Sequence, residues 1–365
     1  MAKVTELGTS GLLGFLETLL EKKLVKGIIA LRSLEDKLGK VAYSLVISKD
    51  NLSGLVPDFP AMPANGGKVI SYFTLKNAPL EPVAVVLRPC EIRALIELAK
   101  LNQAHLENII IIGLECGGVY PYEVLIDQKV INDNLISRYK ESLKNGENPS
   151  GIRPICAGCE NFRPLYADII VSQIGREKPV LSFPTDKGKE IAQALGLILE
   201  EGEIYSSISD VLLKKRKEEK ENISKRIKEE IRGIEGLVKI FDRCIACHCC
   251  SHVCPICYCK DCFFESATFD YSPMDYYNML QDKGTIKLPV DTLLFHLGRM
   301  THMATSCVAC GMCEDVCPVN IPVARIFKTI GSDLQQLFNY LPGRDFEEAL
   351  PLTTYETEEF HEIEE

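Results

Sequence analysis

The sequence has 365 residues, which is long enough for two domains that each bury a core of their own. Charged residues make up 25% and apolar residues 46% of the chain, an ordinary globular composition that argues against wholesale disorder. The net charge of −10 argues against nucleic acid and anionic membranes as partners, because both bind basic surfaces.

The N-terminal residues and the cysteine content indicate the compartment. Residues 1–24 have one early lysine, glutamates within the apolar stretch and no small-residue cleavage site, so we do not expect a signal peptide. No apolar run is long enough to span a membrane. We therefore expect a cytoplasmic protein whose 16 cysteines are metal or cluster ligands rather than disulfides.

Residues 1 to about 200 alternate between strand-like and helix-like segments. Residues 82–101 predict a buried strand that turns at Arg88–Pro89–Cys90 into a helix, and residues 107–120 predict a strand that runs into a Cys–Gly–Gly loop. Further strands are predicted at 26–31, 41–47, 69–75, 167–175 and 178–185, and a further helix at 186–198. Apolar strands that alternate with helices predict an α/β fold with a partly parallel sheet.

Changes in composition divide the chain into four segments. Residues 1–205 form the α/β domain, and the dense mixed charge of residues 206–236 predicts a solvated helix that links two units. Residues 237–330 carry the cysteine motifs and form the second domain. Residues 331–365 are predicted to be an acidic C-terminal tail, loose at its end.

Two stretches share the spacing C-x2-C-x2-C-x3-C-P, which is typical of proteins with two [4Fe–4S] clusters. Three thiolates on a tight loop can bind three corners of a cubane, whereas the fourth lies too far round and binds the other cluster. We therefore assign one cluster to Cys244, Cys247, Cys250 and Cys317, and the second to Cys307, Cys310, Cys313 and Cys254. Pro255 and Pro318 turn the chain away after each crossing ligand.

Zinc is the competing metal, since paired C-x2-C motifs also bind it, but a tetrahedral zinc site does not need a third and fourth cysteine repeated twice. About fifty residues separate the motifs, and a helix is predicted within residues 290–306. The second domain thus resembles the mainly helical dicluster ferredoxins, as in the small cluster subunits of heterodisulfide reductase and succinate dehydrogenase. We expect His296 and His302 to be packing or surface residues rather than ligands.

Eight cysteines remain outside the two motifs' ligand sets. Cys90 and Cys116 each follow a buried strand, at the sheet edge where ligands collect, and Cys156 and Cys159 form a C-x2-C pair in the same domain. These four can hold a third [4Fe–4S] cluster, or they are scattered core cysteines that act as small hydrophobes. Cys249, Cys257, Cys259 and Cys262 can pack around the first cluster or, for the last three, hold a further centre with one borrowed ligand, and we leave them unassigned.

The first 200 residues resemble the beta-subunit family of coenzyme F420-reducing hydrogenases and F420-dependent formate dehydrogenases. The stretches that carry the resemblance are "GTSGLLGFLETLLEKKLVKGIIA", "VAVVLRPCEIRALIEL", "IIIIGLECGG" and "CAGCENFRPLYADIIVSQIG". Cys90, Cys116, Cys156 and Cys159 match cysteines of these blocks, which favours the third cluster. The appended two-cluster half resembles the formate dehydrogenase branch.

The resemblance implies an α/β flavin domain that binds FAD and exchanges a hydride with the soluble deazaflavin coenzyme F420, while clusters carry single electrons. Gly8, Thr9, Ser10 and Gly11 are candidates to hold a phosphate or the flavin edge, although such a loop is also ordinary helix capping. Lys76, Arg88 and Arg93 are candidates to hold acidic cofactor groups, or are solvated surface residues.

The resemblance also implies partners in an anaerobe. No molybdopterin, tungsten or nickel–iron motif is visible, so a catalytic formate dehydrogenase or hydrogenase subunit must lie on another chain. The alternative is a connector that turns over no soluble carrier and links a dehydrogenase to heterodisulfide reductase-type subunits of an electron-bifurcating complex.

Overall fold

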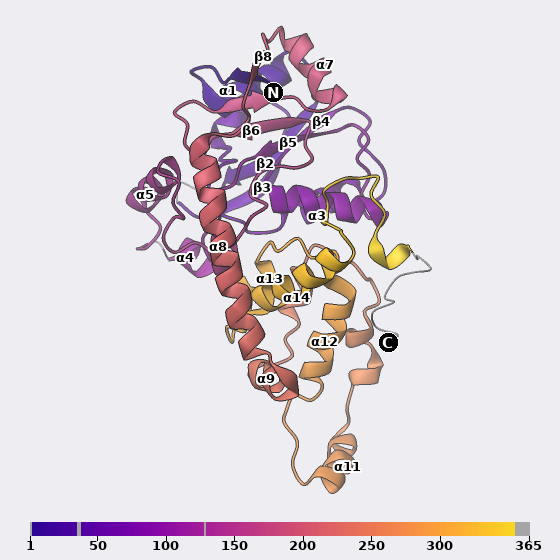
Figure 1. Cartoon of the computed structure of the whole chain (residues 1–365). Coiled ribbons are helices and arrows are strands. Elements are labelled where there is room, and N and C mark those ends of the chain that lie inside the picture. The colour runs from indigo at the N-terminus through magenta and orange to yellow at the C-terminus, as the bar shows by residue number, and fades with distance from the viewer. Residues whose placement is uncertain (1, 35–37, 128, 355–365) are drawn as a thin grey trace.

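The computed structural model describes residues 2–34, 38–127 and 129–354. These residues form one eight-stranded sheet with the order β3-β2-β4-β5-β6-β7-β1-β8, in the upper part of Figure 1. The strands are β1 (Ala2–Glu6), β2 (Gly27–Ser33), β3 (Val41–Val46), β4 (Val83–Leu87), β5 (Ile109–Leu114), β6 (Ile169–Ser172), β7 (Val180–Ser182) and β8 (Glu200–Gly202).

The sheet is mixed, as an α/β fold with partly parallel strands predicts. Strands β2, β4, β5 and β6 are parallel neighbours, whereas β3 pairs antiparallel with β2, and β7, β1 and β8 continue antiparallel beyond β6. Every residue of β4 and β5 is buried, because helices cover both faces of the parallel centre. The short strands β1 and β8 were not predicted.

Helices cover the two faces of the sheet in separate layers. Leu16 and Leu19 of α1 (Gly11–Glu21) and Ile191 of α7 (Asp186–Leu195) pack in one core with one face of the sheet. Helices α2 (Gly66–Thr74) and α3 (Pro89–Lys100) pack on the opposite face, together with Ile256 and Val308 from the second unit. Helix α3 therefore lies between the sheet and the cysteine motifs (Figure 1).

The strand predicted at 69–75 is wrong, because these residues form most of helix α2. The Asn65 side chain accepts hydrogen bonds from the Gly67 and Lys68 N–H groups and so caps the helix N-terminus. Buried Ile70 and Thr74 then lie on one helical face against α3. This capping and packing outweigh the strand propensity of the valine, isoleucine and aromatic residues.

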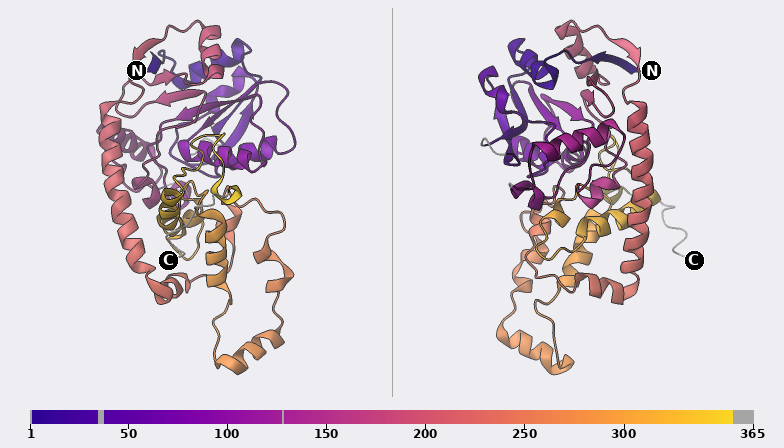
Figure 2. Two further views of the ribbon diagram at one scale, coloured as in Figure 1. Left: turned by 45° about the vertical axis from the view of Figure 1, so that its right-hand side comes forward. Right: turned by 90° about the vertical axis from the view of Figure 1, so that its left-hand side faces the viewer.

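The charged segment after the sheet is a helix, α8 (Ser207–Glu230), as predicted. One face of this helix is buried, so it is not the fully solvated linker that the sequence suggests. Leu212, Arg216, Ile223 and Ile227 lie on one face of α8 and are buried, and Figure 2 shows this helix running along both units. The remaining helices of the α/β unit are α4 (Tyr122–Ile126), α5 (Asp133–Lys144) and α6 (Pro154–Ala157).

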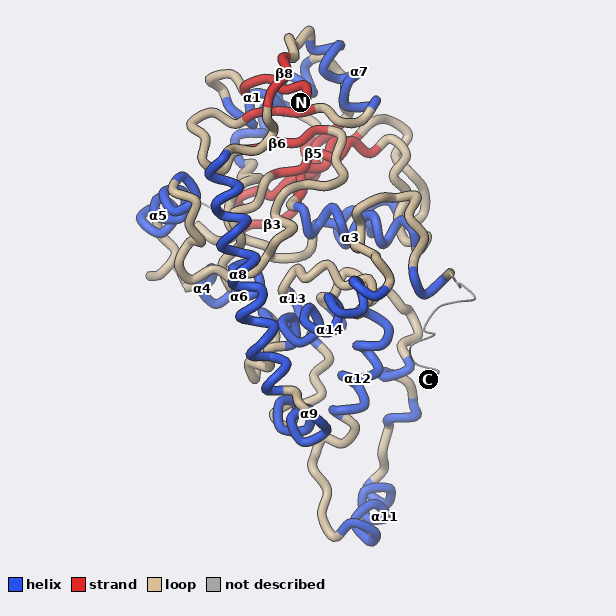
Figure 3. Tube along the Cα trace, in the orientation of Figure 1, coloured by secondary structure: helices blue, strands red, loops and turns tan. Residues whose placement is uncertain are grey.

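The second unit consists of short helices joined by long loops (Figure 3). Its helices are α9 (Gly233–Phe241), α10 (Cys249–His252), α11 (Pro273–Lys283), α12 (Thr292–Met303), α13 (Met312–Asp315) and α14 (Val323–Leu337). Helix α11 stands on an arm that projects away from both units, and none of its described residues is buried (Figure 2).

The segment predicted as a tail from residue 331 is structured at its start. Helix α14 runs on to Leu337, and Tyr340 is buried against α3, where Gly343 N–H donates to Glu97 Oε1 at 2.8 Å. The acidic tail itself, at residues 355–365, lies outside the described residues. Within the part of the chain that the structure describes, no helix combines the length and apolarity needed to cross a lipid bilayer.

The contact between α2 and α3 depends on a glycine. A Cβ on Gly67 would lie 2.3 Å from the Glu91 carbonyl oxygen and 2.7 Å from the Leu95 nitrogen. We expect Gly67→Ala to separate the helices and to lower the free energy of unfolding by about 1–3 kcal/mol, measured as a shift of the urea midpoint. The control Gly8→Ala, where no atom lies within 4 Å of the added Cβ, should leave the midpoint unchanged. Equal midpoints for both variants would contradict the close packing.

Candidate iron–sulfur sites

The two cysteine motifs fold into loops with the same unusual backbone. In each motif the second and fourth residues after the first cysteine have positive φ, which costs free energy for residues other than glycine. They are Ala246 (φ 51°), His248 (φ 53°), Ala309 (φ 56°) and Gly311 (φ 83°). A short helix, α10 or α13, follows each loop. The repetition of a strained conformation indicates that both loops serve the same purpose.

The first cavity formed by these loops is lined by the four cysteines assigned to one cluster. They are Cys244, Cys247, Cys250 and Cys317, three from the first motif and one from the second. Cys249 lines the same cavity from the position beside Cys250. The structure thus brings together residues more than sixty positions apart, although iron ligation itself stays a prediction.

The second cavity has the reciprocal composition. It is lined by Cys307, Cys310, Cys313 and Cys254, three from the second motif and one from the first. Burial raises the pKa of the Cys307, Cys310 and Cys313 thiols, and a negative charge on Cys254 raises each of them further. Iron at this place would relieve that repulsion, because it binds thiolates.

Polar groups point at the cysteine sulfurs of the first cavity. Arg299, which is 3% exposed, donates from Nη1 to Cys250 Sγ at 3.0 Å. Backbone N–H groups donate to sulfur as well, from Ala246 to Cys244 at 3.4 Å and from Ile321 to Cys317 at 3.3 Å. Such donors stabilise thiolates and the anionic clusters that thiolates hold.

The two histidines near the first motif differ in environment. His296 is buried and stacks on Phe241 with ring centroids 4.1 Å apart, and its Nε2 lies 3.4 Å from Cys244 Sγ. Burial lowers the pKa of His296 to about 3, so the ring is neutral. His302 is exposed on α12.

The four cysteines of the α/β unit lie close to one another. Cys116, Cys156 and Cys159 border one core cluster, and Cys90 joins Cys156 and Cys310 at another. The Cys116 loop needs its two glycines, because a Cβ on Gly117 would lie 2.4 Å from Leu143 Cδ1 and Gly118 has a φ of 98°. Cys310 belongs to the second cavity, so the third set is its direct neighbour.

Two buried arginines that sequence reasoning missed hold this region. Arg216 on α8 donates to the carbonyl oxygens of Cys116 at 3.2 Å and Gly117 at 2.8 Å. Arg153 donates to the carbonyl oxygen of Cys310 at 3.3 Å and pairs with Asp315 at 2.6 Å. The sequence contains one signal for the burial of Arg216: it lies four residues after Leu212, and residues four apart lie on the same face of a helix.

The thiols of the two motifs line cavities rather than a single point. Within the described ranges, no group of three or more histidine, cysteine, aspartate or glutamate side chains is arranged to hold a single ion. Zinc binds four ligands about 2.0–2.3 Å from one centre. The two sets from the motifs surround cavities instead, which fits a cluster that offers each thiolate a different iron.

The predicted flavin loop lies at the same sheet edge as the third cysteine set. Glu6 of β1 and Ser172 of β6 both pair with Val180 of β7, and both strands run antiparallel to β7, so β1 and β6 point in the same direction. Residues 7–11 therefore leave the sheet beside the C-terminal ends of the parallel strands. Gly8, Thr9 and Ser10 are exposed, and no atom lies within 4 Å of a Cβ built on Gly8 or Gly11. Three strand spacings, about 14 Å, separate β1 from β5 and the loop of Cys116.

The basic residues proposed for acidic cofactor groups do not gather at this loop. Arg88 is 4% exposed, pairs with Glu91 at 3.6 Å and donates to the Phe59 carbonyl oxygen. Arg93 is 2% exposed and donates to the Pro342 carbonyl oxygen at 2.6 Å, so neither arginine is a solvated surface residue. The N-terminus of α2 lies beside Leu87, at the sheet edge that carries the flavin loop. Lys76 is exposed and follows the C-terminus of α2, so Lys76 lies at the opposite edge of the sheet.

Comparisons with known proteins cover both units. A family described as "4Fe-4S dicluster domain" matches residues 240–321, and one described as the C terminus of the "Coenzyme F420 hydrogenase/dehydrogenase, beta subunit" matches residues 80–205. The F420-dependent formate dehydrogenase subunit beta of Methanocaldococcus jannaschii is 30% identical over 360 residues, which cover 90% of this chain and 89% of that protein. The chain belongs to the coenzyme F420 hydrogenase/dehydrogenase beta-subunit family.

A second curated relative has a similar name. The F420-dependent formate dehydrogenase 1 subunit beta of Methanococcus maripaludis is 31% identical over 370 residues, or 91% of this chain and 90% of that protein. A chain of the solved F420-reducing [NiFe] hydrogenase complex from Methanosarcina barkeri is 16% identical with a TM-score of 0.43, and covers 64% of this chain and 93% of that one. As a member of the coenzyme F420 hydrogenase/dehydrogenase beta-subunit family, the chain is an oxidoreductase subunit with a C-terminal [4Fe–4S] dicluster domain.

The hydrogen bond from Arg299 to Cys250 leads to a test by redox titration. A cationic donor to a ligand sulfur stabilises the more negative, reduced cluster. If Arg299→Met removes about 1 kcal/mol of that preference, the potential of the first cluster should fall by about 40 mV in an EPR-monitored titration. Arg226→Met, on the exposed face of α8, is the control and should leave the potential unchanged. A rise or no change with Arg299→Met would contradict the role of this donor.

Proposed function

We propose that this protein is the electron-transfer beta subunit of a formate dehydrogenase-like complex, which carries electrons between a catalytic partner chain and coenzyme F420. The observation that supports it most is the pair of cavities, each lined by three cysteines of one motif and one of the other. That exchange is what two-cluster ferredoxin units require of the fourth cysteine. The two relatives are named as subunits of F420-dependent formate dehydrogenases.

The proposed ligands follow the three groups of thiols. Cys244, Cys247, Cys250 and Cys317 hold the first [4Fe–4S] cluster, Cys307, Cys310, Cys313 and Cys254 hold the second, and Cys90, Cys116, Cys156 and Cys159 hold the third. The left-handed loop residues fit this role, because they turn backbone N–H groups towards sulfur. When bound, the clusters supply one-electron transfer.

The order of the three sites supports a linear path. The first and second cavities exchange cysteines, and the second and third sets meet where Cys90 and Cys310 border one apolar cluster. Arg153 spans this junction, since it contacts both Cys310 and Asp315 and directly precedes the helix that carries Cys156. Its positive charge is suited to neutralise part of the negative charge that thiolates bring to a buried region.

The flavin belongs beyond the third cysteine set. Gly8, Thr9, Ser10 and Gly11 form the loop at the N-terminus of α1, where a phosphate or the flavin edge can bind, although the Gly11 N–H itself donates to the Gly8 carbonyl oxygen at 3.0 Å. When bound, FAD supplies the conversion between a hydride and single electrons. Arg88 acts from the buried side, where it fixes the start of α3 beside Cys90, and Lys76 is not part of the proposed site.

The proposal includes domains, compartment and partners. We propose a flavin domain at residues 1–205, a helical link at 206–236, and a mainly helical two-cluster domain from 237 that extends beyond 330 to the segment packed on α3. The protein works in the cytoplasm of an anaerobe, and catalysis on the primary substrate takes place on a partner formate dehydrogenase or hydrogenase subunit. Heterodisulfide reductase-type subunits are partners only if the chain is a connector.

Cysteine exchange between the motifs can be tested by spectroscopy. The three proposed clusters together require at least about 12 iron atoms in the anaerobically purified chain, four per cubane. We expect Cys254→Ser and Cys307→Ser to alter the same EPR signal, and Cys244→Ser and Cys317→Ser to alter the other. If Cys254→Ser instead alters the signal that Cys244→Ser alters, the ligands do not cross. A colourless protein with zinc and no acid-labile sulfide would refute the proposed function.

Turnover of the soluble carrier separates the proposed enzyme from a connector. We expect reduced coenzyme F420, mixed with the flavin-replete chain in a stopped-flow instrument, to bleach flavin absorbance promptly because the flavin accepts the hydride. A reduced nicotinamide serves as the control carrier. No reaction with reduced F420 in a sample that contains FAD would favour the connector.

A further inference from the structure

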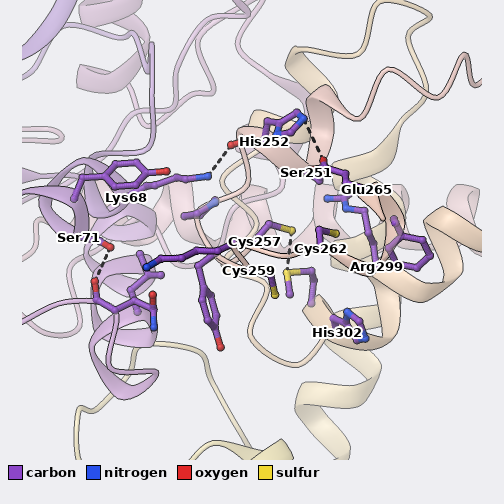
Figure 4. A pocket seen from close by; sticks show the side chains of 18 of the residues that line it. Lys68, Ser71, Ser251, His252, Cys257, Cys259, Cys262, Glu265, Arg299 and His302 are labelled. Atoms are coloured by element: carbon purple, nitrogen blue, oxygen red, sulfur yellow. Dashed lines mark hydrogen bonds and ion pairs between the residues drawn. The ribbon is translucent and has the colours of Figure 1, made fainter. Parts of the chain in front are cut away.

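Three thiols that the proposed clusters do not use line a separate cavity. Cys257, Cys259 and Cys262 fall within six residues of one loop and border a cavity of about 350 Å³ between α2 and α12. Figure 4 shows their side chains together in the middle of this cavity. Cys249, the other unassigned cysteine, lines the first cluster cavity instead. The four unassigned cysteines therefore fall into two sets: Cys249 lies beside the first proposed cluster, and the other three lie together in a separate cavity.

Core packing involves only part of this group of thiols: Cys262 borders the buried cluster of Phe264 and Phe295. Cys259 is exposed and Cys257 and Cys262 are half-buried, and all three are free cysteines. Core cysteines are among the most buried residues, and proteins avoid free thiols on open surfaces. Three of them on one cavity therefore indicate a ligand that binds sulfur.

The loop that carries the thiols is fixed at both ends. Lys68 on α2 donates from Nζ to the carbonyl oxygens of His252 at 2.6 Å and Cys254 at 2.9 Å. At the other end Phe264 is buried, and its ring packs edge-on to Phe295 with centroids 5.5 Å apart. Contacts from both units thus hold the backbone of the loop that carries the cysteines in place, as a preformed ligand site requires.

The cavity also offers positive charge and further ligand types. Arg299 is 3% exposed and lines the cavity, and its Nε has no hydrogen-bond partner among the described residues. Met303 Sδ lies 3.4 Å from Cys257 Sγ, and His302 lines the same wall. A buried cation with an unused donor next to three thiols fits an anionic, thiolate-bound centre.

We propose that Cys257, Cys259 and Cys262 hold a fourth [4Fe–4S] cluster, with the fourth iron facing the side of the cavity where His302 lies. Three thiols that line one cavity can each bind a different iron of a cubane, as the three closely spaced cysteines of each ferredoxin motif are proposed to do. The site lies three residues from Cys254, a proposed ligand of the second cluster, so it branches from the proposed path. This inference adds to the proposed function, but its ligands are separate from those of the three clusters.

Metal and sulfide analysis of the full chain, purified anaerobically, tests the proposal. Wild type should contain about 16 iron and 16 acid-labile sulfide per chain, against about 12 for three clusters. Cys257→Ser/Cys259→Ser/Cys262→Ser should lose about four of each, while the EPR signals of the ferredoxin clusters persist. Asp261→Asn, at an exposed position of the same loop, keeps all three thiols and should keep the full content.

A second variant guards against damage to the second cluster. Cys259→Ser/Cys262→Ser leaves Cys257 beside Cys254 and should lose the same four iron atoms, while the EPR signals of both ferredoxin clusters persist. Equal iron and sulfide in wild type and both variants overturns the fourth cluster, and so does loss of about one zinc without sulfide. Absence of the ferredoxin signals from wild type would refute the proposed function instead, so the two failures are distinguishable.

Discussion

The exchange of one cysteine between two loops is the constraint on which the second unit depends. Neither cavity is complete without a residue of the other motif, since Cys317 closes the first and Cys254 closes the second. The loops must therefore pack face to face, and α10 and α13, which follow them, are in contact. The arm that carries α11 can vary in length, because none of its described helix residues is buried, whereas α12 places Arg299 against Cys250.

Charged side chains connect this unit to the sheet domain at its buried face. Lys68 on α2, Arg93 on α3 and Arg153 before α6 all donate to carbonyl oxygens of the second unit or of the segment after α14. Burial lowers the pKa of Arg93 and of Lys68, and negative charge on the neighbouring cysteines opposes that shift. The contact between the units therefore serves geometry and electrostatics together, with the third cysteine set next to the second cavity.

The sequence predicted what depends on local pattern. Apolar runs located β4 and β5, and cysteine spacing located both motifs and the crossing that the cavities display. The prediction failed where contacts between residues far apart in the sequence determine the structure. Residues 69–75 have the composition of a strand, but the Asn65 cap and the surface of α3 stabilise a helix there. Arg216 looked like one more charge on a solvated helix, because nothing near it in sequence reveals the carbonyls of residues 116 and 117 that it binds. The same holds for Arg88 and Arg93, which are buried only because other segments cover them.

Strand β1 has a consequence for how the chain is made. Its neighbours in the sheet are β7 and β8, so it pairs with segments that are synthesised much later and begin at Val180 and Glu200. At about 5–20 residues per second, synthesis of the intervening chain takes roughly 10–35 s. During that time the nascent N-terminal segment has an open hydrogen-bonding edge, while α1 and the parallel strands are already available to fold. Strand β1 can therefore take its place in the sheet only after β7 has been synthesised, later than the parallel strands at the centre.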